Sequence, residues 1–136
     1  MGREIIDATE TLGKTPGYSY AARSVGGAIV YTAGAVPLDR EGKLVGAGNL
    51  EEQTRVVIDN LNAALEAAGV SSADVLKTTI YVVGHEREDL SRAWRVFAAT
   101  NLATAPSTLV GVALLGYDEQ LVEIEAVAAD SRPPLT

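Results

Sequence analysis

The 136-residue sequence contains no cysteine and a single histidine, His85, and both scarcities restrict its chemistry. A chain without thiols forms no disulfide, no zinc–thiolate site and no cysteine nucleophile. With one imidazole, only metals bound through oxygen remain open, and the sequence has no loop of spaced Asp and Asn residues for them. We therefore expect no metal site, and we interpret His85 as a loop residue rather than as part of a Ser-His-Asp triad.

Positive charge is scarce too, with 11 Lys and Arg residues against 18 Asp and Glu residues and a net charge of −7. Such a surface repels phosphate backbones and leaves no basic stripe, so we expect no nucleic-acid partner. No apolar run approaches the ~20 residues that span a bilayer, and the first residues lack the apolar core of a secretory signal. We expect a cytoplasmic protein that does not associate with membranes.

Linkers and low-complexity tracts are also missing, so the length predicts one domain spanning residues 1–136. Strand-like runs occupy residues 3–8, 18–25 and 28–34 near the N-terminus. Gly26 and Gly27 separate the second run from the third. Because two-residue hairpin turns need positive φ angles, this pair predicts a hairpin between them.

Two helices are expected beyond these strands. Asn49 is placed to cap a helix that ends before Gly69, and a second apolar stripe at residues 90–97 includes Trp94. We interpret Trp94 as a core or subunit contact rather than as a platform for a ligand. A strand at residues 75–83 separates them. With two C-terminal strands the order is β-β-β-α-β-α-β-β, an α+β domain with two helices on one face of the sheet. The other face keeps enough Val and Ala to need a partner.

The C-terminal part combines a Val- and Leu-rich run at residues 107–115, a turn at 116–119 and a strand at 122–128. In that last strand Glu123 and Glu125 alternate with apolar residues, which places both carboxylates on one face, roughly 7 Å apart. By pattern alone, such a pair is often a solvated sheet face.

This segment resembles the C-terminal signature of the RidA/YjgF family, small trimeric proteins that hydrolyse reactive imines and enamines. The family pattern is Pro-x-Arg-Ser, a Val-rich strand and a closing V-E-I-E-A. The corresponding residues here are 105–108, with sequence APST, and 122–126, with sequence VEIEA. The likeness extends to PGYSYA at residues 16–21, to IVYTAGAVPLD at 29–39 and to residues 60–82, so it covers nearly the whole chain.

The resemblance implies a chorismate-mutase-like (YjgF-like) fold with a mixed β-sheet, a homotrimer with ligand clefts between subunits, and no cofactor. Carried over position by position, Glu123 would orient the attacking water and Tyr18 would pack over the ligand. Ala33 and Gly34 would form part of the substrate-binding frame, and backbone groups at Leu109 would hold or polarise the ligand.

The chain departs from the family pattern where the carboxylate-clamping arginine would be, because it has Ser107 there. Two charge-assisted hydrogen bonds are lost, which weakens recognition of an imino acid by about two to four powers of ten. Without the guanidinium the cleft would be neutral to acidic and would favour neutral or cationic ligands. Neither Arg23 nor Arg92 is well placed in sequence to replace it, although another subunit could supply one.

The sequence therefore favours a cytosolic protein that hydrolyses a reactive imine or enamine to a carbonyl compound and ammonia with altered specificity. Two alternatives stay open. The first is a non-catalytic trimer that binds a metabolite in the same clefts. The second is an interaction protein whose trimer surface, rather than its cleft, is the working part.

Overall fold

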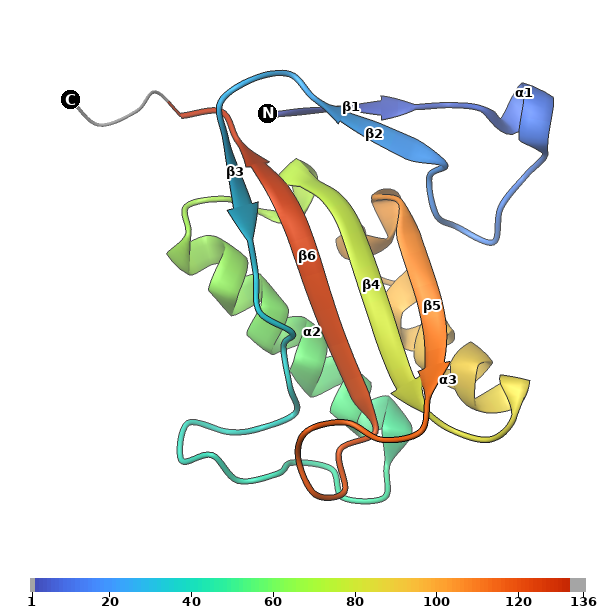
Figure 1. Ribbon diagram of the computed structural model, residues 1–136, viewed down its shortest axis with the longest axis vertical. Helices are drawn as coiled ribbons and strands as arrows, with labels where there is room; N and C mark the ends of the chain where they lie inside the picture. The colour runs from blue at the N-terminus through green and yellow to red at the C-terminus, as the bar shows by residue number, and fades with distance from the viewer. Residues whose placement is uncertain (1, 133–136) are drawn as a thin grey trace.

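A four-stranded mixed sheet with two helices on one face forms the body of the molecule (Figure 1). The computed structural model describes residues 2–132. Within this range no helix combines the length and apolar character needed to cross a bilayer. The elements are β1 (Arg3–Ile6), α1 (Thr9–Leu12), β2 (Ala21–Ser24), β3 (Ala28–Tyr31), α2 (Leu50–Ala67), η1 (Ser72–Asp74), β4 (Val75–Val83), α3 (Arg87–Ala98), η2 (Asn101–Thr104), β5 (Ser107–Val112) and β6 (Val122–Asp130).

The strand order of the main sheet is β3-β6-β4-β5, with β5 at one edge. Strands β4 and β5 are parallel, and the chain returns between them through α3, whereas the other neighbours are antiparallel. The expectation of an α+β fold with a mixed sheet and two helices on one face is confirmed.

The predicted hairpin around Gly26 and Gly27 is wrong. Strand β2 pairs with β1 in a separate two-stranded sheet, and β3 pairs with β6. Both glycines do have positive φ, 125° and 85°, and a Cβ on Gly27 would lie 2.1 Å from the Asp130 carbonyl oxygen. The pair therefore forms the turn in which the chain passes the end of β6 and crosses from one sheet to the other. Positive φ angles occur in many kinds of turn, so they do not determine which strand β2 pairs with.

Helix α2 begins and ends where its sequence predicts. The Asn49 side chain accepts a hydrogen bond from the Glu52 N–H at 3.0 Å, and Gly69 follows the last turn with a φ of 82°. Its inward residues Val57, Leu61 and Leu65 are fully buried against the sheet and α3. The apolar stripe of α2 thus closes the core on the helix side.

The opposite face of the sheet is open in one chain. Along β6, Val122, Ile124 and Ala126 are buried under the helices, while Glu123 and Glu125 alternate with them on the other face. Apolar side chains share this open face, including Tyr31 of β3, which is 76% exposed. Other strands begin later or end earlier than predicted, since β2 starts at Ala21 and β5 stops at Val112.

A fully buried glutamine on α2 connects two loops that are far apart in sequence. The Gln53 amide nitrogen donates to the carbonyl oxygens of Gly46 at 3.1 Å and Glu119 at 3.0 Å, and its oxygen accepts from the Leu121 N–H at 2.8 Å. Glu119 has a φ of 61°, which is uncommon for a residue other than glycine. Gln53 thus holds the turn that leads into β6.

We predict that Gln53→Leu lowers the free energy of unfolding by about 2–4 kcal/mol, because three backbone groups lose a buried partner. Chemical denaturation followed by circular dichroism measures this change. Asp59→Leu, which introduces the same side chain at an exposed position of α2, should change stability by less than about 0.5 kcal/mol. Equal effects of both variants would contradict the structural role of Gln53.

Candidate functional site

The Glu123 carboxylate is positioned by the turn before β6. The Gln120 side-chain amide donates to the Glu123 carboxylate at 3.1 Å and to the Val122 carbonyl at 3.0 Å. Its oxygen accepts from the Tyr117 N–H at 3.1 Å, and the residue is only 3% exposed. Because all of these bonds come from one buried amide, one oxygen of Glu123 has a fixed orientation on the open face of the sheet.

Gly34 lies directly against Glu123. The segment after β3 continues along β6, where the Thr32 N–H donates to the Ala126 carbonyl at 3.0 Å and the Ala35 N–H donates to the Ile124 carbonyl at 2.8 Å. Between these bonds, a Cβ on Gly34 would lie 1.9 Å from a Glu123 carboxylate oxygen. Only glycine therefore leaves room for the carboxylate in this position.

Ala33 is exposed next to this glycine. The backbone N–H groups of Ala33 and Gly34 have no hydrogen-bond partner among residues 2–132. Two free donors thus lie in the segment that packs against the carboxylate of Glu123. The structure brings together three of the predicted site residues, Ala33, Gly34 and Glu123.

The second carboxylate of the pair has a different environment. The Tyr81 hydroxyl donates to Glu125 at 3.0 Å, and this hydrogen bond is the main reason why the pKa of Tyr81 is raised above its usual value of 10. The bond stabilises the fold while Tyr81 is neutral, so its contribution is complete below pH 10 and is lost as the pH rises through the raised pKa. Glu125 is therefore engaged with a neighbouring side chain.

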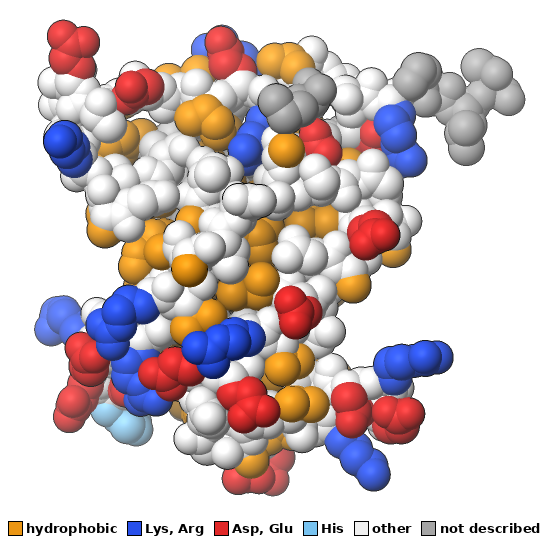
Figure 2. All heavy atoms as spheres, turned by 180° about the vertical axis from the view of Figure 1, so that it is seen from behind, with side chains coloured by type: hydrophobic (Ala, Val, Ile, Leu, Met, Phe, Trp, Pro, Cys, Tyr) orange, Lys and Arg blue, Asp and Glu red, His pale blue; other side chains and the backbone are white. Residues whose placement is uncertain are grey.

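The other predicted residues, Tyr18, Ser107 and Leu109, lie in a pocket of about 580 Å³ on the helix side. Trp94 forms one wall, where its indole N–H donates to the Pro16 carbonyl at 3.2 Å and its ring meets Tyr18 edge to face at 6.2 Å. The pocket is lined by Pro16, Tyr18, Ser91, Trp94, Arg95, Ser107, Thr108 and Leu109. In Figure 2, seen from the helix side, hydrophobic side chains lie above the charged residues that gather over α3.

Ser107 does not stand in for a cation, because its hydroxyl is already engaged. Its Oγ lies 3.1 Å from the Ala105 carbonyl oxygen and 2.6 Å from the Thr78 hydroxyl. If Ser107 donates to the carbonyl, Thr78 is the donor to Ser107, and both hydroxyl hydrogens are used. Ser107 therefore stabilises the start of β5.

The backbone of Leu109 points to the edge of the sheet. The Thr78 N–H donates to the Pro106 carbonyl at 3.0 Å, so the peptide groups of alternate residues from Pro106 onward face β4. Those of Leu109 face the other way, and β5 is the last strand on that side of the main sheet. The Leu109 N–H and carbonyl thus face away from β4, and their role in holding a ligand stays a prediction.

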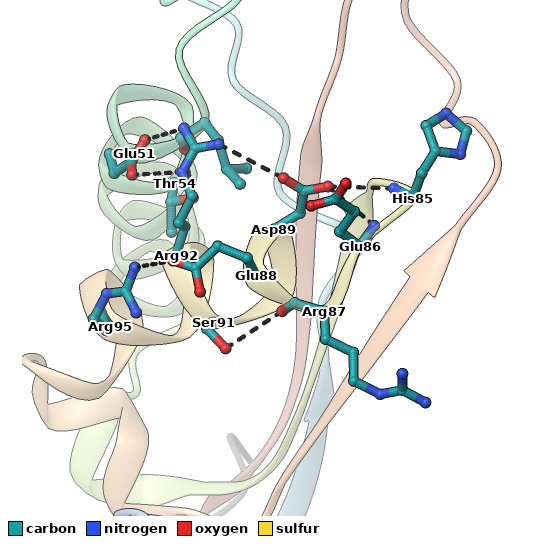
Figure 3. A network of polar contacts seen from close by, with 11 residues as sticks. Glu51, Thr54, His85, Glu86, Arg87, Glu88, Asp89, Ser91, Arg92 and Arg95 are labelled. Carbon is teal, nitrogen blue, oxygen red and sulfur yellow. Dashed lines mark hydrogen bonds and ion pairs between the residues drawn. The ribbon is translucent and has the colours of Figure 1, made fainter.

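Arg95 is a pocket residue that the sequence did not reveal. It follows Trp94 on α3 and lies one helical turn after Ser91, so all three side chains reach the same pocket. That this face of α3 lines a pocket is visible only in the tertiary structure. Its guanidinium pairs with Glu88 at 2.8 Å (Figure 3).

The two arginines weighed from the sequence are held elsewhere. Arg23 pairs with Glu4 across the small two-stranded sheet. Arg92 donates to both oxygens of Glu51 at 2.8 and 2.7 Å (Figure 3), and this bond lowers the pKa of Glu51 to about 2. Neither guanidinium lines the pocket, in agreement with the expectation that they are poor substitutes.

His85 is an exposed residue before α3, as predicted, and its backbone N–H donates to Asp89 at 3.2 Å. It lies beyond the end of β4, whereas Ser107 pairs with Thr78 near the start of that strand. The Thr32 hydroxyl accepts from the Ala126 N–H at 2.9 Å. Within residues 2–132, no group of three or more His, Asp or Glu side chains is placed to hold a metal ion.

The predicted site residues form two groups on opposite faces of the sheet. Glu123, Ala33 and Gly34 belong to the open side along β6, whereas Ser107 and Leu109 belong to the helix side of the edge strand β5. Strand β4 separates β6 from β5. One chain therefore carries both groups but does not bring them together.

These features define a small α+β domain with an open-face carboxylate and a separate aromatic pocket. A family model described as Endoribonuclease L-PSP matches residues 10–130. A RutC family protein from Pyrococcus horikoshii is 36% identical over 128 residues, 93% of this chain and 97% of the relative. The chain belongs to the YjgF/RidA family.

Two further relatives are a protein named as a deaminase and a protein of known structure. The 2-iminobutanoate/2-iminopropanoate deaminase of Salmonella typhimurium is 34% identical over 104 residues, 75% of this chain and 80% of that enzyme. The Rid family protein YyfB from Yersinia pestis has a TM-score of 0.82 and 34% identity, covering 95% of this chain and 99% of the other. The family predicted from the sequence is confirmed.

We predict that Gly34→Ala displaces the Glu123 carboxylate without unfolding the protein. The clash falls on the end of a flexible side chain, so the free energy of unfolding should change by less than about 1 kcal/mol. The side-chain amide signals of Gln120 in a ¹H–¹⁵N NMR spectrum should shift, because their acceptor has moved. Gly116→Ala is the matched control, since nothing lies within 4 Å of its Cβ position. Unchanged Gln120 signals in Gly34→Ala would refute the predicted clash.

Proposed function

We propose that this protein hydrolyses a reactive imine or enamine to a carbonyl compound and ammonia, with Glu123 as the residue that activates water. The observation that carries the proposal is the Glu123 carboxylate, oriented by the buried Gln120 amide and packed against Gly34. Among residues 2–132 it has no cationic partner. A carboxylate that is held in place but not neutralised is suited to accept a proton from water.

The proposed reaction balances with water as the only co-reactant. Water adds its oxygen to the carbon of the C=N bond while Glu123 accepts one of its protons. Glu123 gives this proton to the nitrogen, which produces a carbinolamine. The carbinolamine hydroxyl then loses its proton to Glu123, which passes it to the nitrogen as the C–N bond breaks, so that ammonia and a carbonyl compound leave. An enamine first takes a proton at carbon to become the imine. The N–H groups of Ala33 and Gly34 are available to position the water or the ligand.

We further propose that the working site forms between subunits of a homotrimer. Glu123 and the pocket of Tyr18 and Leu109 lie on opposite faces of one sheet, so a second copy is needed to place one beside the other. The exposed Tyr31 on the open face supports an assembly that covers this face. Deaminase relatives in the family support the same reaction class.

A small imine or enamine fits the charge of the chain better than RNA does. The description of the matching family model names an endoribonuclease, but a net charge of −7 repels a phosphate backbone. The proposed reaction needs neither a metal nor an organic cofactor. Cofactor independence and a cytoplasmic location are part of this proposal.

The decay of enzymatically generated 2-iminopropanoate and 2-iminobutanoate, with and without protein, tests the activity. We expect the wild type to accelerate decay and Glu123→Gln to lose about 10²–10⁴-fold of that acceleration, because the amide cannot accept the proton. Glu125→Gln is the matched control on the same strand face and should retain activity.

Acceleration that persists in Glu123→Gln would contradict the assigned role. Saturable ligand binding without turnover would replace the proposal with a metabolite-binding trimer. If the wild type is inactive and Ser107→Arg becomes active, the scaffold is intact and the natural ligand is not a small imino acid.

A mixing experiment tests whether the site spans two subunits. Coexpressed Glu123→Gln and Tyr18→Ala chains should recover activity above the mean of the two separate preparations, since some clefts combine an intact carboxylate with an intact pocket. Coexpressed Glu123→Gln and Gly34→Ala chains, which damage the same side of the cleft, should recover none. If neither mixture recovers activity, the whole site lies in one chain and the proposal of a shared site is wrong.

A further inference from the structure

We propose that the pocket between the N-terminal segment and α3 binds a small organic carboxylate with a bulky apolar or aromatic body, and that Arg95 is its anion-binding residue. The inference deepens the proposed function by naming the ligand class, and it rests on that function only for the reacting group. It is carried by the shape and lining of the pocket and by the state of the Arg95 guanidinium.

The pocket has the size and the surface of a small-molecule site. Its volume of about 580 Å³ lies within the range of ordinary ligand pockets. Trp94 and Tyr18 present aromatic surface, and Leu109 contributes an aliphatic floor that packs on the core. The aromatic and aliphatic lining offers more apolar surface than a ligand of two or three carbon atoms can cover, so it favours a larger apolar body.

One residue supplies the charge in the part of this pocket that the structure describes. Among its lining residues, all within residues 2–132, Arg95 is the only one with a charged side chain. The Ser107 hydroxyl is neutral and is hydrogen-bonded to Thr78 and to the Ala105 carbonyl, so it supplies no positive charge to the pocket. A single cation at the rim of an aromatic pocket selects an apolar ligand with one negative group.

The Arg95 guanidinium is available to such a ligand. Its one hydrogen bond within residues 2–132 runs from Nη2 to Glu88, and both side chains of this pair are 62% exposed. Exposed pairs of this kind contribute little and are screened by salt. The other guanidinium N–H groups of Arg95 have no hydrogen-bond partner in the described part of the chain, so a ligand carboxylate can join or replace Glu88.

Arg92, one helical turn away from Glu88, shows the contrast. It donates two hydrogen bonds to Glu51 and also lies 3.6 Å from Asp89 (Figure 3). These partners join α3 to α2 and leave Arg92 committed to the fold. Because Arg92 is held by the fold and Arg95 is available at the pocket, we expect the pocket to prefer apolar anions. This replaces the preference for neutral or cationic ligands that the sequence suggested.

Trp94 is the only tryptophan of the chain, so intrinsic fluorescence reports on this pocket directly. The full-length protein is titrated with phenylacetate and with phenylacetamide, its uncharged counterpart of nearly the same shape. We expect phenylacetate to bind about tenfold more tightly, a factor typical of one charge-assisted contact at a partly exposed site. Arg95→Gln should abolish this preference while the amide affinity stays within about twofold.

Two neighbouring variants control for charge. Arg87→Gln removes an arginine of the same helix that points away from Arg95 (Figure 3), and it should keep the preference for phenylacetate. Glu88→Gln frees Arg95 from its partner and should increase that preference.

Equal affinity for both probes, a preference that survives in Arg95→Gln, or binding of neither probe would overturn the inference; the last result is expected if a neighbouring subunit fills the pocket. The fluorescence readout needs no turnover. A retained carboxylate preference in a protein that fails to accelerate imine decay would therefore refute the proposed function and leave this inference standing.

Discussion

The buried amide of Gln53 is the constraint on which the position of Glu123 depends. It joins the loop before α2 to the turn before β6, and it holds Glu119 in a backbone conformation that few residues adopt. That turn carries Gln120, whose own buried amide orients Glu123. The position of the carboxylate is therefore determined by two uncharged side chains, because buried amides must satisfy donors and acceptors on both ends.

The sheet divides the chemistry of the chain into two parts. An acceptor carboxylate lies on the open face, and an aromatic pocket with Arg95 at its rim lies on the helix side of the edge strand. A single polypeptide cannot fold one part onto the other, because side chains of neighbouring strands keep to their faces. On the helix side, Ser107 is held by hydrogen bonds within the fold, and the positive charge beside the pocket comes from Arg95 on α3.

Much of this arrangement could be read from the residues themselves. The capping of α2 by Asn49 and the alternation around Glu123 are local patterns. The first predicts the start of a helix and the second predicts a strand. The family likeness was equally visible in the sequence. The partner of β2 was not, because Gly26 and Gly27 permit a hairpin as readily as a crossing between sheets. Arg95 was missed because a helical surface residue becomes a pocket residue only when the opposite wall is known.

The sequence by itself determined the two long helices, the approximate positions of the main strands, the α+β class, the acidic surface and the presence of Glu123 on a strand face, since these depend on composition and short-range periodicity. The tertiary structure alone decided which strands are neighbours, which arginine reaches the pocket and which hydroxyl is already satisfied. These outcomes depend on contacts between residues distant in the chain, such as Ser107 with Thr78 and Trp94 with Pro16. Their free energies come from burial and pairing in three dimensions, which no local pattern encodes.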